Sequence, residues 1–443
     1  MISESSDEDI WVISSWRTDI PNKVKFINQS ISRMPFPDCC YQVVHALDRY
    51  FESSDPESIK TPALFISAFL VELIDQYLFH ITDQKKSSLT ALQELRLLEL
   101  LNTHFKEQKS DFVRWLVFDT LFSFTNQEQK EKKFNRRLDL LTKLVSMAIA
   151  LRNGNIMDCM ALWMQKHRHF SSIVVQVSTS VIEDYSCLVP ISLPFLQSVS
   201  LSSPHLACQL IVALTSIHTM IPTEHSSDSL KLHPALSTLK VIVKWISQDP
   251  SICLIKPNRT FITLPSLHSP TAASPVTPPL PLCPVRGLVQ WTVLEPLTRL
   301  KLNEPSDMKQ SLKDMYSELH LGLLQALVMS GKSKFNPKDD MELEPGEVMD
   351  ESDTLRHLLD SKDLKRLTDS MVKFIDSLNE TIDVLPDARN DAVNISIDRI
   401  AQIIQVSIAT GCLSSSKGDL LEICKSVPKN CLLETVVANL DSL

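Results

Sequence analysis

Apolar residues recur every three to four positions along most of the chain, which is the spacing of one face of an α-helix. Thr90 and Gln93 have the spacing of a capping box, so a helix is expected from Thr90 to Phe105. Ser110 is expected to cap a second helix that runs to Leu121. The first of these helices should bury one apolar stripe, formed by Leu92, Leu95, Leu98, Leu101 and Phe105.

Turn residues between the apolar runs are those of helix ends. After a buried helix at 138–151, Gly154 is expected to take the left-handed conformation that ends the helix, and Asn155 to cap the next one. Pro204 and Pro234 are each expected in the first turn of a helix, where the missing N–H of proline costs nothing. Strand alternation bounded by Asn-Gly or Asp-Gly pairs is absent from the sequence.

Three further apolar stripes lie in the C-terminal third. We expect glycine to end the first stripe at Gly331 and the third at Gly411, and two short helices to follow at 419–425 and 431–440. The stripes consist of Leu312, Met315, Leu319, Leu323 and Leu327; of Leu364, Leu367, Met371, Phe374 and Leu378; and of Ile397, Ile400, Ile404 and Ile408.

Helices of ordinary length joined by short turns predict an all-α protein. Their broad apolar faces favour an irregular α-solenoid of antiparallel helix pairs, similar to HEAT and armadillo repeats. Two segments that cannot pack as helices interrupt this pattern, one rich in proline and one acidic. The expected organisation is a flexible acidic extension (1–38), an N-terminal helical-repeat region (39–255), a Pro/Ser/Thr-rich linker or loop (256–286), and a C-terminal helical region (287–443) with a disordered acidic insert (336–353).

Composition argues against nucleotide-binding enzyme sites built on glycine-rich loops. The chain has only 7 glycines in 443 residues, and they are dispersed, whereas dinucleotide sites and P-loops need clustered glycines. Gly331-Lys332-Ser333 resembles the end of a P-loop, but Ala326 stands where the leading glycine is required, which favours a helix C-terminus. Neither G-x-S-x-G nor H-E-x-x-H occurs. No catalytic, cofactor-binding or small-molecule site is therefore predicted.

Metal and disulfide chemistry are also not favoured. His167 and His169 are two residues apart, not three or four, and are expected at a solvated helix end. The ten cysteines form no C-x-x-C pair, and the adjacent Cys39 and Cys40 are expected to begin a helix as reduced thiols. The acidic start of the chain lacks the signature of a signal peptide, and no apolar run reaches the length of a membrane span, so an intracellular chain without a membrane segment is expected.

Charge is concentrated in two places. The full chain has a net charge of −9. Eight acidic residues and no Lys or Arg lie between 339 and 353, so the rest of the chain is close to neutral. This balance argues against direct contact with nucleic acid. The acidic segment either contacts a basic partner, through Asp339, Asp340, Glu342, Glu344 and Glu347, or is a solvated linker. A basic run directs nuclear localisation, contacts nucleic acid, or is a charged loop between helices. It consists of Lys130, Lys132, Lys133, Arg136 and Arg137.

Six stretches resemble, in the same order, the vertebrate Integrator complex subunit 15 family: 92–100, 143–150, 183–190, 287–291, 316–327 and 396–411. The resemblance implies a non-catalytic nuclear subunit of Integrator, the metazoan assembly that cleaves nascent RNA at snRNA genes and attenuates RNA polymerase II transcription. It further implies partners in a peripheral arm that holds subunits ten, thirteen and fourteen. The acidic segment 339–353 is an insertion relative to that family.

Two other functions stay open. An armadillo-type transport or cargo adaptor would need a groove lined by regularly spaced Asn and Trp, whereas the six tryptophans are irregularly placed. An enzyme whose site is assembled across helices would need a deep pocket that holds buried, mutually bonded titratable groups. The leading hypothesis is an all-α scaffold that acts by binding other proteins.

Overall fold

The computed structural model describes residues 29, 31–52, 74–78, 89–124, 132–188, 192–217, 234–255, 279–302, 305–333, 358–379 and 385–439. These residues form two compact units. Unit 1 takes its described residues from 1–169 and 183–188, and unit 2 from 170–182, 189–257 and 278–443. The described chain is almost entirely helical, which confirms the predicted all-α class. The solenoid arrangement and the predicted division of the chain stay predictions.

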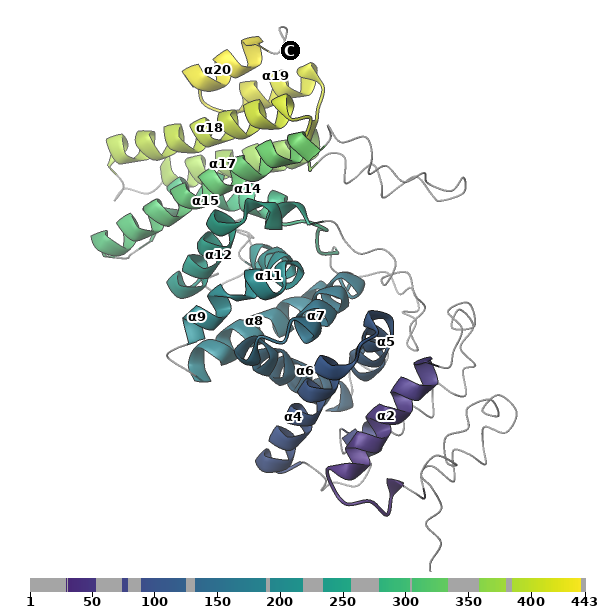
Figure 1. The fold of residues 1–443 in the computed structure, drawn as a ribbon. Coiled ribbons are helices and arrows are strands. Elements are labelled where there is room, and N and C mark those ends of the chain that lie inside the picture. The colour runs from purple at the N-terminus through teal and green to yellow at the C-terminus, as the bar shows by residue number, and fades with distance from the viewer. Residues whose placement is uncertain are drawn as a thin grey trace, which may run out of the picture. The chain divides into compact units, whose positions relative to one another are not determined.

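Unit 1 is built from α-helices and a short π-helical segment (Figure 1). α2 packs against α5 and η4, α4 packs against α6 and α7, and α5 contacts both α6 and α7. The elements are α2 (Asp38–Glu52), η4 (Ile74–Leu78), α4 (Ala91–Glu107), α5 (Asp111–Phe122), α6 (Lys132–Leu151) and α7 (Gly154–Lys166). The largest side chains of its core are fully buried; they are Phe105, Trp115, Phe118, Phe122, Phe124 and Trp163.

Local signals correctly predict where α4 and α5 begin. Thr90 and Gln93 form the capping box, and the Ser110 hydroxyl accepts the Val113 N–H. The expected stripe of α4 is wrong at its start, because Leu92 is 68% and Leu95 44% exposed. The rest of the stripe, Leu98, Leu101 and Phe105, is buried as expected, and Leu97 is buried beside it.

The turn between α6 and α7 differs from the prediction by one to two residues. Arg152, with a φ of 54°, takes the left-handed position that was assigned to Gly154, and the Asn153 N–H donates to Ala148 O in a Schellman turn. α7 already begins at Gly154, so Asn153, not Asn155, precedes its first turn. The Asn153 side chain makes no capping hydrogen bond, and its Nδ2 donates to Asn102 Oδ1 of α4 at 3.0 Å.

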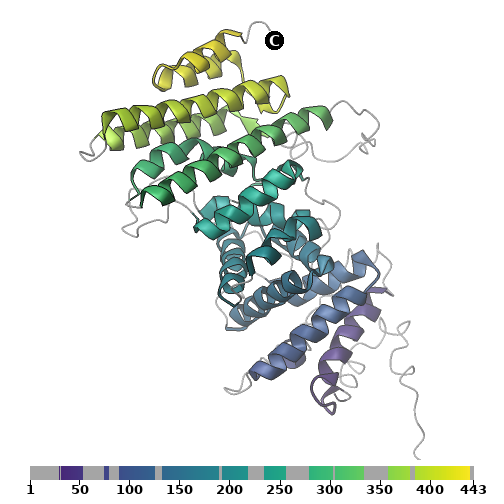
Figure 2. The same cartoon turned by 60° about the vertical axis from the view of Figure 1, so that its left-hand side comes forward.

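Unit 2 is the larger helical unit. It contains residues 171–182 of α8 (Ser171–Leu188), with α9 (Ser192–Gln197), α10 (Val199–Ser202), α11 (Pro204–Ile217), α12 (Leu236–Gln248), η6 (Pro250–Leu254), α14 (Val285–Leu300), α15 (Ser306–Ser333), α17 (Ser361–Asn379), α18 (Pro386–Ala409), α19 (Lys417–Ser426) and α20 (Cys431–Ala438). α14 is central, since it packs against α11, α15, α17 and α18. α15 and α18 also contact each other, and Figures 1 and 2 show both helices in the same stack.

A pair of two-residue strands joins the start of α17 to the turn after α18. β1 (Leu359–Asp360) pairs in parallel with β2 (Leu413–Ser414), with Leu359 opposite Leu413. β2 follows Gly411, whose φ of 65° ends α18 as predicted. The Cys412 N–H donates to Ser407 O in the accompanying Schellman turn.

Two other predicted helix limits in unit 2 are wrong. α15 continues through Gly331 to Ser333. A glycine ends a helix in a left-handed turn only at positive φ, and in the described chain positive φ occurs at Arg152 and Gly411, not at Gly331. Pro204 begins α11 as expected, but Pro234 precedes α12, which starts at Leu236.

No single helix in the described part of the chain is long and apolar enough to cross a membrane. Two neighbouring helical segments, Phe195–Ser202 and Pro204–Ile217, reach that length and apolarity only together, and the pair is bent by 119°.

Candidate interaction surfaces

A fully buried carboxylate joins three helices of unit 2. Glu295 of α14 contacts Arg399 of α18 at 3.2 Å and Arg299 of its own helix at 2.8 Å. Arg399 also donates to Thr292 O and, at 3.1 Å, to the Ser317 hydroxyl of α15. Burial raises the pKa of Glu295 in spite of the two guanidinium groups, and burial lowers the pKa of Arg399. Because these groups bond to each other in the interior, they hold helices together and present no reactive group to a substrate.

A second buried cluster joins α5 and α7 in unit 1. Asp119 pairs with Lys166 at 2.8 Å and accepts a hydrogen bond from Ser123 at 2.5 Å, and Ser123 lies 3.4 Å from His167 Nε2. In a hydrolytic triad the histidine lies between the serine and the carboxylate, whereas here the serine lies between the other two. The prediction of a solvated His167 is wrong, because its ring is buried and stacks on Phe124 at 4.5 Å.

The predicted basic run is only partly described. Lys130 lies outside the described residues, and Lys132 and Lys133 begin α6. Arg137 is buried and pairs with Asp75 at 2.6 Å, and Arg136 pairs with Glu94 of α4 at 2.9 Å. The predicted acidic contact residues, Asp339, Asp340, Glu342, Glu344 and Glu347, all lie outside the described residues. Both predicted sites stay predictions.

The thiols of Cys159 and Cys253 have the environment of packing residues, whereas the Cys39 thiol is perturbed by its neighbour. Cys39 and Cys40 begin α2 as predicted and are buried, with Cys40 Sγ donating to Tyr77 O at 3.3 Å. A hydrogen bond from Cys40 lowers the pKa of Cys39 to about 7, and the same contact raises the pKa of Cys40. Burial raises the pKa of Cys159 and Cys253, which keeps these thiols protonated. Among the described residues, no three His, Cys, Asp or Glu side chains are placed to hold a metal ion.

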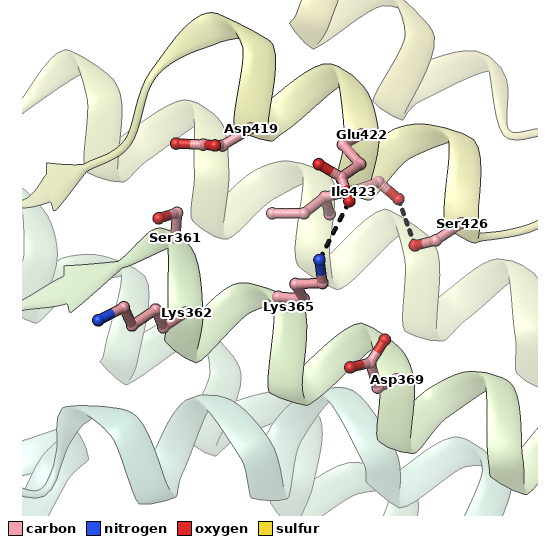
Figure 3. A pocket seen from close by; sticks show the side chains of 8 residues that line it. All are labelled: Ser361, Lys362, Lys365, Asp369, Asp419, Glu422, Ile423 and Ser426. Carbon is pink, nitrogen blue, oxygen red and sulfur yellow. Dashed lines mark hydrogen bonds and ion pairs between the residues drawn. The ribbon is translucent and has the colours of Figure 1, made fainter.

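A polar cavity of about 220 Å³ lies between α17 and α19 (Figure 3). Its lining residues are Ser361, Lys362, Lys365, Asp369, Asp419, Glu422, Ile423 and Ser426. Lys365 donates to Glu422 at 3.0 Å, and this contact raises the pKa of Lys365 although both side chains are exposed. A cavity of this kind can exchange ion pairs with a partner, but it does not hold the buried, mutually bonded groups that the enzyme hypothesis needs.

The described tryptophans lie in the core. Trp115, Trp163, Trp245 and Trp291 are fully buried, and the Trp245 indole donates to Leu196 O at 2.9 Å. These side chains therefore cannot line the open groove that an armadillo-type cargo adaptor would use.

Sequence reasoning missed an exposed apolar surface on α15. Leu321 is 57% and Val328 41% exposed, and Met329 is also exposed, although all three lie on a helix whose opposite face is buried. The available signal was the absence of charge, since residues 319–331 contain no Asp, Glu, Lys or Arg. Periodicity alone directed attention to the buried stripe of the same helix.

Comparison with known proteins gives one family. The profile of the Integrator complex subunit 15 family matches residues 25–429. Proteins named Integrator complex subunit 15 from Homo sapiens and Danio rerio are 31% and 30% identical to this chain, over 93% and 90% of its length and 86% and 77% of theirs. The Drosophila melanogaster protein of that name is 25% identical over 79% of each chain. The match is collinear with nearly all of the helical units described above, and the chain belongs to the Integrator complex subunit 15 family.

Proposed function

We propose that this chain is a non-catalytic scaffold or adaptor subunit of the nuclear Integrator complex, acting through protein contacts in snRNA 3′-end processing and in attenuation of RNA polymerase II transcription. The observation that carries the proposal is the family match over residues 25–429. The partners are other Integrator subunits, in the arm that contains subunits ten, thirteen and fourteen.

The chemistry of the described residues supports a role without catalysis. The buried charges of Glu295 and Asp119 form ion pairs with residues of neighbouring helices. The polar cavity beside Lys365 is open to water. Buried Trp163 and Trp245 do not favour the cargo-adaptor alternative.

Affinity purification of the tagged full-length chain from nuclear extract tests the proposal. We expect recovery of Integrator subunits, with subunits ten, thirteen and fourteen among the strongest. Recovery of transport cargo without any Integrator subunit would instead support the cargo adaptor, and recovery of neither would refute the assignment.

The acidic segment can be tested separately, because the elements on either side of it, α15 and β1, both contact Cys412. The Leu359 N–H donates to Cys412 O at 3.1 Å, and the Cys412 thiol donates to Leu327 O at 3.8 Å. α15 and β1 are thus both attached to the turn after α18, so replacement of 339–353 by a short Gly/Ser linker should leave the unfolding temperature unchanged. Unchanged partner recovery by that variant would exclude the acidic segment as a contact.

Nuclear localisation by the basic run is tested with Lys130, Lys132 and Lys133 changed together to Ala. Arg136 and Arg137 are left intact because they pair with Glu94 and Asp75, and their loss would confuse misfolding with mislocalisation. Cytoplasmic accumulation of a folded triple variant is the expected result. An unchanged nuclear signal would show that this basic run does not direct nuclear localisation.

A further inference from the structure

An uncharged surface runs along the C-terminal halves of α15 and α18, and we refer to it as the α15–α18 strip. On α15 it consists of Leu321, Leu324, Val328 and Met329, and on α18 it consists of Gln402, Val406 and Ala409. Leu321, Val328, Met329 and Ala409 are exposed, and the other members are half-buried.

Specific contacts hold the two halves of the strip side by side. His320 bonds to Gln402 at 2.8 Å, and Cys412 contacts Leu327 O, so both helices advance in the same direction here. Leu324 lies one helical turn after His320, and Val406 one turn after Gln402, which places both on the facing edges of the helices. The strip therefore belongs to one packed pair within unit 2.

The spacing of the apolar residues that reach the surface of α15 matches that of helix recognition. Leu321, Leu324 and Val328 follow the i, i+3, i+7 pattern by which an amphipathic helix and its receptor surface place their anchors. Two turns of helix span about 11 Å. An α-helix from another protein can contact these side chains while its polar face stays in water.

Charge determines what can occupy the strip. Residues 319–331 and 400–416 contain no Asp, Glu, Lys or Arg, although 22% of the whole chain is charged. Phosphate groups of nucleic acid or of a membrane need basic contacts, which the strip does not offer. A charged peptide would lose hydration without gaining a partner charge. Depletion of charge around exposed Leu, Val and Met is typical of the centre of a protein interface.

We propose that the α15–α18 strip docks the uncharged apolar face of an α-helix from another Integrator subunit. This inference rests on the proposed function, because it takes the partner from the complex to which the chain is assigned. The occupant is recognised by Leu, Ile, Val or Met at i, i+3 or i+4, and i+7, without charged residues among those positions.

Leu321→Glu combined with Val328→Glu tests the proposal in the full-length chain. Leu201→Glu is the matched control, because Leu201 is 77% exposed and lies in unit 2 on α10, outside the strip. We expect the double variant to keep its circular dichroism spectrum and unfolding temperature and to recover Integrator subunits at least about tenfold less than wild type, as for loss of interface anchors. The control should recover them like wild type.

A photo-crosslinking amino acid in place of Val328 identifies the occupant. The expected product joins this chain to an Integrator subunit through a peptide that carries the uncharged anchor pattern. Capture of a second copy of the chain would overturn the proposal, and so would recovery by the folded double variant within twofold of wild type. Failure of the wild-type chain itself to recover Integrator subunits would instead refute the proposed function.

Discussion

Replacement of Glu295 by Gln removes the only carboxylate that contacts the guanidinium groups of Arg399 and Arg299 among the described residues, while it keeps the size of the side chain. Glu295 is fully buried and the Arg399 side chain is only 7% exposed, so Arg399 would stay in the interior without a counter-charge. Breaking a buried pair in this way costs about 3–5 kcal/mol. For a unit of this size, we expect the midpoint of thermal unfolding to fall by about 10 °C.

The assays are thermal unfolding and urea unfolding of the full-length chain, each followed by circular dichroism and by tryptophan fluorescence. Glu295→Leu combined with Arg399→Met is the informative control, because replacing both partners by apolar side chains removes the pair without leaving Arg399 unpaired. That double variant should be at least about 2 kcal/mol more stable than Glu295→Gln. Lys365→Met is the surface control, and it should cost less than about 1 kcal/mol because Lys365 and Glu422 are both exposed.

Two results would contradict this reasoning. One is a loss for Glu295→Gln as small as that of Lys365→Met, which would mean that water or backbone groups already compensate the two arginines. The other is a double variant less stable than the single one, which would show that shape, not charge, dominates the contact among α14, α15 and α18.

Three further predictions concern single residues. Arg152→Gly should raise the free energy of unfolding by about 0.5–1 kcal/mol in urea titrations, because glycine adopts the φ of 54° without steric cost and Arg152 is exposed; a loss would contradict the turn geometry. Gly411→Ala should lower it by about 1 kcal/mol, since alanine is strained at a φ of 65°, and an unchanged value would count against the assigned turn. Burial lowers the pKa of His320 to about 4, so the contribution of neutral His320 to the free energy of unfolding is complete above pH 6.5 and is lost as pH falls through 4. His320→Gln should therefore lose less stability than wild type between pH 7 and pH 4. Equal losses in the two proteins would show that other groups cause the acid sensitivity.

Several helix limits were predictable from the sequence because their caps are formed by neighbours in the chain. The box of Thr90 and Gln93, the Ser110 cap and the stop at Gly411 each depend on contacts within a few residues, and all three are found in the structure. Family membership was also recognisable from collinear stretches of sequence, because it does not depend on which side of a helix is covered.

The buried stripes of the C-terminal helices were predicted by periodicity, but on other helices the buried face was decided only by tertiary structure. Leu92 has the periodicity of a core residue and is exposed, whereas His167 was expected in water and stacks inside the core. On α15, the buried stripe and the exposed Leu321 and Val328 are equally apolar in sequence. Burial depends on helices that are distant in the sequence, and a local pattern does not say how far those helices extend over a given face. The sequence alone therefore determined the helical class, several locally formed caps and the family, and packing determined which apolar residues stay exposed.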